Sequence, residues 1–180
     1  MKISNILISQ PSPQNSSPYT ELTSKFEVNI DFHPFFTVEP LTAKEFRAQK
    51  INILDFTAIV FTAKTTIDAF FKLCEELRVT VPETMKYFCN SEATAVYLQK
   101  HIVFRKRKIF YGNGTTASII DTIGSKHKDE KFLIAATADN LKGDLHKLFS
   151  KTKFKFESAA FVKTIYSDLK EIDLSKYQIA

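Results

Sequence analysis

The sequence predicts an α/β fold in which a parallel sheet carries helices on both of its faces. Short apolar runs of strand length recur along the chain, and segments with apolar residues at helical spacing separate most of them. The links between these segments are short, which favours parallel strands joined by helical crossovers. The 180 residues are 44% hydrophobic and include 17 phenylalanines, so the chain has enough apolar surface for a packed interior.

The first part of the chain contains two expected strands around one helix. The apolar run at 3–9 ends before a proline-containing loop, as a buried strand does. Residues 16–24 are expected to form a short helix. Apolar and polar residues then alternate over 26–32, which is the period of a strand. Residues 35–41 form an extended segment closed by Pro40.

A longer alternation of helices and strands follows. Thr42 stands three residues before Glu45, a capping-box pattern that predicts the start of a helix. Further helices are expected at 67–77, 92–100, 119–124 and 141–149, and strands at 56–61, 86–90, 108–111, 131–136 and 154–165. Residues 177–180 resemble the opening of another buried strand, so we expect the chain to lack its C-terminal part.

The charge of the chain suits an anionic ligand. The formal net charge is +5, and basic residues gather at 100–101 and 105–108. This cluster is either a solvated loop or a local field that attracts a polyanion. Few aromatic residues interleave with it, so we expect no nucleic-acid partner. No apolar run has the length of a membrane span and the N-terminus lacks a signal-peptide pattern, so we expect a cytoplasmic protein without a membrane partner.

Several kinds of site are not expected. Gly112-Asn113-Gly114 follows a predicted strand, but a dinucleotide fingerprint would need a glycine where Ala117 stands. The histidines are scattered singly, and we expect solvated surface positions and no metal site for His33, His101, His127 and His146. Cys74 lies among apolar residues and is predicted to be a buried free thiol.

Polar residues collect where the predicted strands end. Carboxyl ends of parallel strands are the usual place for a ligand in such folds. The polar residues at these ends are Thr62, Lys64, Thr65, Ser91, Thr94, Asn113, Thr115, Thr116, Asn140 and Lys142. Together with free N–H groups at helix N-termini they suit carboxylates. They also suit simple helix capping, and the two interpretations remain open.

Several motifs in these loops resemble those of one family. They are Ser9-Gln10-Pro11, Val60-Phe61-Thr62-Ala63-Lys64-Thr65-Thr66-Ile67-Asp68, Asn90-Ser91-Glu92-Ala93-Thr94-Ala95, Tyr111-Gly112-Asn113, Asn140-Leu141-Lys142 and Phe161-Val162-Lys163-Thr164-Ile165. In this order they resemble the uroporphyrinogen-III synthase family, most closely bacterial members with an S-Q-P start.

The resemblance implies two flavodoxin-like domains joined by a two-stranded linker, the first domain being incomplete here. Residues 1–35 and 168–180 would belong to domain 1, 36–41 and 159–167 to the linker strands, and 42–158 to a complete domain 2. The resemblance also implies that substrate is bound by Thr62, Ala63, Lys64, Ser91, Glu92, Thr94, Gly112, Asn113, Asn140 and Lys142. Thr62 and Thr94 would face the cleft between the two domains.

The activity implied is the cyclisation of linear hydroxymethylbilane to uroporphyrinogen III, with inversion of the last pyrrole ring and loss of water. Such enzymes need no metal or cofactor, and we expect a monomer. The family's usual tyrosine is Val162 here, with Tyr166 a weak substitute, and the usual serine is Ala63. The alternative is therefore a module of the same fold that binds a polycarboxylate or tetrapyrrole without turning it over. We expect the 180 residues alone to be inactive.

Overall fold

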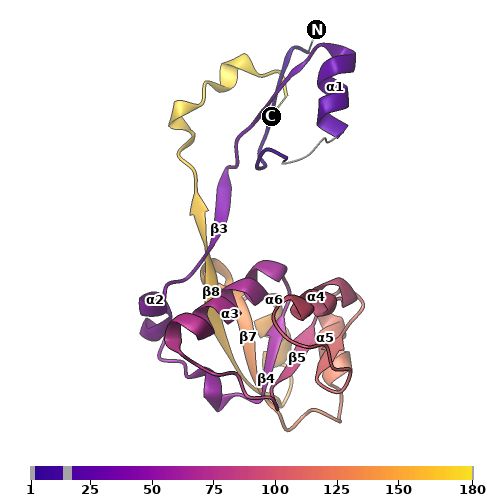
Figure 1. Cartoon of the computed structure of the whole chain (residues 1–180), viewed down its shortest axis with the longest axis vertical. Coiled ribbons are helices and arrows are strands. Elements are labelled where there is room, and N and C mark those ends of the chain that lie inside the picture. Colours follow the sequence, from indigo (N-terminus) through magenta and orange to yellow (C-terminus); the bar gives the residue numbers. More distant parts are fainter. Residues whose placement is uncertain (1–2, 14–17, 180) are drawn as a thin grey trace. The chain divides into compact units, whose positions relative to one another are not determined.

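The computed structural model describes residues 3–13 and 18–179. Two compact units make up the chain (Figure 1), and each is treated by itself below. Unit 1 comprises Met1–Thr37 and Ile165–Ala180, and unit 2 comprises Val38–Thr164. Residues 16 and 17 of the predicted first helix lie outside the described residues.

Unit 2 is built on a sheet with the strand order β3-β8-β7-β4-β5-β6. The strands are β3 (Phe36–Pro40), β4 (Ala58–Phe61), β5 (Lys86–Cys89), β6 (Ile109–Tyr111), β7 (Lys131–Thr137) and β8 (Lys155–Tyr166), the first and last of which continue into unit 1. Every pairing from β8 through β7, β4 and β5 to β6 is parallel. The predicted α/β class with a parallel sheet is therefore confirmed.

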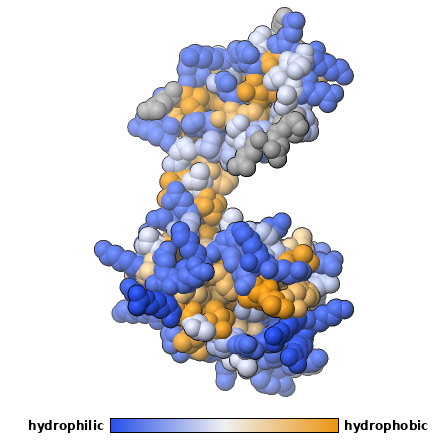
Figure 2. Space-filling model, in the orientation of Figure 1, coloured by the Kyte–Doolittle hydropathy of each residue, from blue (hydrophilic) through white to orange (hydrophobic). Residues whose placement is uncertain are grey.

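Helices cover both faces of this sheet (Figure 1). The helices of one face are α2 (Ala43–Ala48), α3 (Lys64–Leu77) and α4 (Glu92–Tyr97), and those of the other are α5 (Ala117–Ile123) and α6 (Asp144–Ser150). Strand β4 shows why two cores form, because its four residues are all buried. Ile59 and Phe61 pack into the core under α3, and Ala58 and Val60 pack into the core under α5 and α6. Figure 2 shows mainly hydrophilic residues on the visible surface, with apolar residues between them.

Unit 1 contains a parallel pair of strands and a helix. These are β1 (Asn5–Ile8), α1 (Pro18–Phe26) and β2 (Asn29–Phe32). The chain returns beside β1, where the Leu7 amide donates to the Ile179 carbonyl at 2.9 Å. The side chain of Gln178 accepts from the amides of Ser4 and Asn5, each at 2.9 Å. The predicted strand character of this last segment is thus present as a bridge to β1, although Ile179 is 46% exposed and not buried.

Several predicted elements are confirmed and others need correction. The capping box before α2 is complete, because Thr42 and Glu45 each accept a hydrogen bond from the other's backbone amide. Cys74 is a buried free thiol, as expected. The strand expected from Phe26 begins only at Asn29, because α1 runs through Phe26 and Glu27 then takes a left-handed φ of 51°.

Two later helices are shorter than expected. The predicted helix 92–100 changes to a 3-10 turn after Tyr97, and the helix predicted from residue 141 starts at Asp144. The expected surface position of His127 is wrong, since its ring packs against Phe88 and Phe110 and is only 6% exposed. Among the described residues, no helix has both the length and the apolar content needed to cross a bilayer.

Candidate functional site

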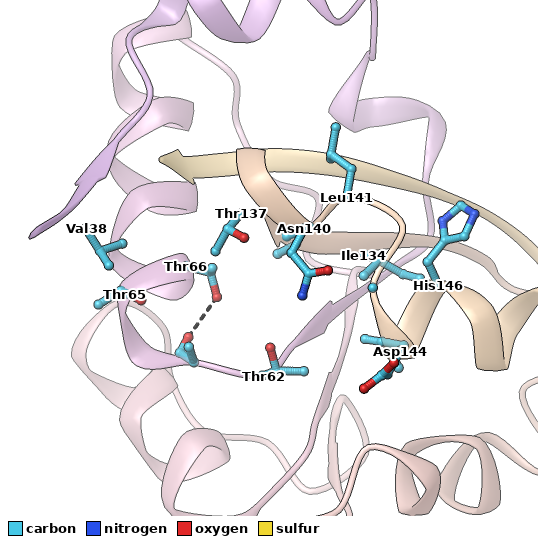
Figure 3. Close-up of a pocket in the computed structure, with 15 residues that line it drawn as sticks. Val38, Thr62, Thr65, Thr66, Ile134, Thr137, Asn140, Leu141, Asp144 and His146 are labelled. Carbon is cyan, nitrogen blue, oxygen red and sulfur yellow. Dashed lines mark hydrogen bonds between the residues drawn. The ribbon is translucent and has the colours of Figure 1, made fainter. Parts of the chain in front are cut away.

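A pocket of about 180 Å³ opens at the carboxyl ends of β4 and β7 in unit 2. Its walls come from the loop that joins β4 to α3, from the end of β7, and from the turn that leads into α6. In Figure 3 the side chains of Thr62, Thr137 and Asn140 surround one open space, with Asp144 at its edge. Strand ends of a parallel sheet converge here as the sequence predicted.

The β4–α3 loop supplies unused donors. Thr62 is exposed beside the pocket, and the first-turn amides of α3 lie two to four residues further along. Ala63 is the N-cap residue of α3 and offers no side-chain cap. The hydroxyl of Thr66 donates to the Ala63 carbonyl at 2.8 Å (Figure 3) and so does not cap the amides either. A carboxylate at this position would satisfy these amides and the positive end of the helix dipole.

The turn before α6 shapes the opposite wall. Asn140 ends a 3-10 turn, and its carbonyl accepts from the Gly143 amide at 3.2 Å. A Cβ on residue 143 would lie only 2.4 Å from Asn140 Oδ1 and 2.6 Å from Nδ2. Glycine at position 143 therefore lets the Asn140 amide fold back against the turn, where it faces the pocket.

A β-bulge lies at the end of β7. Ala136 pairs with Ala160, whereas Thr137 pairs with Val162, so Phe161 is an extra residue in β8. The side chain of Gln49, at the end of α2, accepts from the Ala160 amide at 2.8 Å and donates to the Ala160 carbonyl at 2.9 Å. This amide thus satisfies both backbone groups of Ala160 beside the bulge, and Thr137, on the other strand, lines the pocket.

The loop after β5 provides a side-chain cap for α4, unlike the loop before α3. Ser91 Oγ accepts from the Thr94 amide at 3.3 Å and lies 3.0 Å from the Thr94 hydroxyl. Thr94 is only 6% exposed, so its hydroxyl serves the cap. Glu92 is exposed at this helix end, and its Oε1 accepts from the Tyr111 hydroxyl at 3.3 Å.

The loop after β6 is held by its own hydrogen bonds. Gly112 approaches Ser118 closely, and the Asn113 amide donates to Ser118 Oγ at 3.1 Å. Asn113 Oδ1 accepts from the amide and hydroxyl of Thr115, at 3.1 Å and 2.9 Å. The Asn113 side chain thus forms an Asx-type turn and is not free.

Two lysines predicted for the site lie outside the pocket lining. Lys142 is exposed on the turn before α6. The ammonium of Lys64 lies 5.3 Å from the centroid of the Tyr97 ring, a cation–π distance. The Tyr97 hydroxyl in turn donates to Asp68 at 2.7 Å, which joins the start of α3 to the end of α4.

Asp68 makes further contacts with residues at the end of α4 and just beyond it. Its carboxylate also lies 2.7 Å from His101 Nε2 and 3.3 Å from Lys100 Nζ. Partial burial acts to raise the pKa of Asp68, but the hydrogen bonds from Tyr97, His101 and Lys100 outweigh it and lower that pKa. The carboxylate therefore stays charged at neutral pH and reduces the local positive field of the basic cluster.

Val162 and Tyr166, the two positions considered for a tyrosine acid, differ in burial. Val162 is 1% exposed and belongs to the core under α3. Tyr166 is 73% exposed at the end of β8. Val162 does not line the pocket at the ends of β4 and β7.

The structure brings together Thr62, Ala63 and Asn140 from the predicted set, and the other seven lie outside this pocket lining. It adds Thr137, Asp144 and His146, which the sequence analysis did not select. Thr137 was recoverable, since it directly follows the strand predicted at 131–136. His146 had no local signal, because it reaches the pocket from within α6, where Nδ1 lies 2.9 Å from Ser158 Oγ.

The fold and this pocket define an α/β domain with a carboxyl-edge site suited to a carboxylate. Residues 17–175 match the profile of the family described as uroporphyrinogen-III synthase HemD. The chain therefore belongs to the uroporphyrinogen-III synthase family.

Solved structures support the same fold. A mutant uroporphyrinogen III synthase of Thermus thermophilus superposes with a TM-score of 0.65 at 10% identity, covering 91% of this chain and 64% of the other. The uroporphyrinogen-III synthetase of Helicobacter pylori gives a TM-score of 0.53 at 16% identity, covering 98% of this chain and 68% of the other. This chain thus spans about two thirds of the length of these enzymes. No curated protein sequence matches it.

Proposed function

We propose that the complete gene product is a uroporphyrinogen-III synthase, a lyase that cyclises linear hydroxymethylbilane to uroporphyrinogen III. The hydroxyl leaves as water, and the carbon that carried it bonds to the substituted carbon of the last pyrrole. The existing methylene bond to that carbon breaks and re-forms at the free α-carbon, which loses its proton, so the ring is inverted. The observation that carries the proposal is the family match over 17–175. A cytoplasmic monomer is part of the same proposal.

The pocket at the ends of β4 and β7 supports a role in holding the substrate. The bilane is a flexible polycarboxylate, and the free amides at the start of α3 suit one carboxylate. Thr62 and Asn140 would add a hydroxyl and an amide to the same contact. At about 180 Å³ the pocket has room for a side chain of the substrate and not for the whole chain of four pyrroles.

Positioning is the main catalytic demand in this proposal. Ring closure must take place at the substituted carbon of the last pyrrole, and an unassisted bilane closes elsewhere to give isomer I. Fixing the conformation of the bound chain raises the effective concentration of the correct carbon. With Val162 buried in the core, a tyrosine acid at that position has no part in the mechanism proposed here.

The alternative of a binding module without turnover rests on Val162 and Ala63, which replace the tyrosine and serine implied by the family resemblance. Both functions share the pocket, so binding alone does not separate them. Because the chain spans 64% of the Thermus enzyme, we propose that the 180 residues alone bind the bilane but do not cyclise it.

A product assay separates these functions. Hydroxymethylbilane is supplied to the complete gene product, and isomers I and III are resolved by chromatography after oxidation. We expect isomer III in excess, and we expect Thr62→Val to lower kcat/KM about tenfold by removing one hydroxyl contact. Lys44→Gln, on exposed α2 surface, is the matched control. Binding of the bilane with only isomer I as product supports the alternative. If the protein does not bind the bilane and forms no isomer III, both functions are refuted.

A further inference from the structure

A second pocket lies at the opposite edge of the sheet, where the strands begin. It has a volume of about 220 Å³ and is walled by the segment that leads into β5 and the segment that leads into β6. The two segments are neighbours because β5 and β6 are parallel, with Tyr87 paired to Ile109. The substrate pocket proposed above lies at the carboxyl ends of the strands, so the two pockets share no lining residue.

The inner wall of this second pocket is apolar except for one hydroxyl. Val81, Met85 and Ile102 supply aliphatic and thioether surface, and Met85 is only 2% exposed. Tyr87 also lines the pocket and is 4% exposed. Its ring stacks parallel to Phe61 at a centroid distance of 6.4 Å, which fixes its orientation.

The Tyr87 hydroxyl has no hydrogen-bond partner within residues 3–13 and 18–179. Burial raises the pKa of Tyr87, so the hydroxyl keeps its proton at neutral pH and remains a donor. The Tyr87 hydroxyl is not among the fully enclosed side-chain atoms without a partner, so it opens to the pocket and has no acceptor from the described part of the protein. A ligand with an acceptor at its apolar end would provide one.

The mouth of the pocket is cationic. Arg105 and Lys108 line it, and the one acidic residue there, Glu83, lies 3.8 Å from Arg105 with its side chain 88% exposed. That ion pair is long and solvated, so it leaves Arg105 available to another anion. The pocket lining thus combines two cations with the hydroxyl donor of a largely buried tyrosine.

We propose that this pocket binds a small monocarboxylate with a single apolar ring and a hydrogen-bond acceptor on the far side of that ring. The carboxylate would pair with Arg105 and Lys108, and the acceptor would take the Tyr87 proton. The volume suits one ring with a short side chain and excludes a tetrapyrrole. The proposal is independent of the synthase activity, because the two pockets have separate linings.

Methionine methyl NMR provides a direct test. The sequence contains only Met1 and Met85, so ¹³C-methyl-methionine labelling gives one reporter in the pocket and one reference. We expect 4-hydroxyphenylacetate to shift the Met85 methyl signal saturably. Phenylacetate, which lacks the acceptor, and 4-hydroxyphenylacetamide, which lacks the charge, should each bind more weakly by about two- to tenfold.

Two variants assign those differences to residues. Tyr87→Phe should abolish the preference for 4-hydroxyphenylacetate over phenylacetate, while Arg105→Gln/Lys108→Gln should abolish the preference over the amide. Tyr111→Phe and Lys106→Gln/Arg107→Gln are matched controls outside the lining and should change neither preference.

The proposal is overturned if no probe shifts the Met85 signal saturably at concentrations on the order of 10 mM. It is equally overturned if the three probes bind alike, or if the pocket variants and the controls give the same preferences. A melting temperature for each variant separates loss of binding from loss of the fold.

Discussion

Gly112→Ala tests how tightly the loop after β6 is packed. A Cβ at position 112 would lie 2.0 Å from Ser118 Oγ, 2.8 Å from Ser118 Cβ and 3.2 Å from the Asn90 carbonyl oxygen. Ser118 is 7% exposed, and its hydroxyl accepts from the Asn113 amide and donates to the Thr115 carbonyl. The serine therefore cannot move aside without breaking both hydrogen bonds.

The expected loss of stability has two parts. Overpacking of a buried contact costs about 1–3 kcal/mol. Losing hydrogen bonds of Ser118 adds about 1 kcal/mol. We expect Gly112→Ala to lower the free energy of unfolding by about 2–4 kcal/mol, measured by urea unfolding followed by circular dichroism.

A second substitution isolates the crowding. Ser118→Gly removes both the Oγ and the Cβ that the new methyl group would meet, so the double variant should recover about 1–3 kcal/mol relative to the sum of the single variants. Gly114→Ala is the control, because Gly114 has a φ of 104° and no atom near its missing Cβ. Its cost comes from backbone strain, and Ser118→Gly should not relieve it. Additive effects of Gly112→Ala and Ser118→Gly would refute the crowding argument.

Two further predictions concern the pocket wall and acid stability. Gly143→Ala should displace the exposed Asn140 amide, while stability falls by no more than about 1 kcal/mol. If the complete gene product is the proposed synthase, the same substitution in it should raise KM for the bilane several-fold. An unmoved Asn140 side-chain NMR signal would contradict the displacement. The Lys163 ammonium and hydrogen bonds from Thr42 lower the pKa of Glu45 to about 2. Because this is below the ordinary value of 4.5, the carboxylate stabilises the fold above about pH 4.5 and loses that effect as the pH falls toward 2. The melting temperature of Glu45→Gln should thus lie below that of the unmodified chain at pH 7 and converge with it near pH 2, and a constant difference would refute the assignment.

Local patterns in the sequence were sufficient for most of the fold. The Thr42 and Glu45 pair predicted a capping box because both partners lie within one helical turn. The apolar run at 56–61 predicted a strand, and β4 is fully buried inside the sheet with helices on both sides. The strand predicted from Phe26 was wrong in its start, because α1 runs through Phe26 and the chain turns at Glu27 before β2.

The site depended more on contacts that are distant in sequence. Gln49 supports the backbone at Ala160, 111 residues away, and no short pattern signals that pair or the bulge beside it. His127 was predicted to lie on the surface because lysines flank it. Its ring instead packs against Phe88 of β5 and Phe110 of β6, which are distant in sequence. Strand ends can be predicted from local periodicity, whereas the side chains that share a pocket depend on the strand order.

The starts of α3 and α4 differ in how readily they could bind a carboxylate. Ser91 caps α4, so a ligand carboxylate there would have to displace the serine from the Thr94 amide. The equivalent position before α3 is Ala63, which leaves the first amides of a 14-residue helix without a side-chain acceptor. A serine at position 63 would compete with a carboxylate for those amides. The replacement of the usual serine by Ala63 therefore favours anion binding at the pocket, whereas the replacement of the usual tyrosine by Val162 counts against turnover.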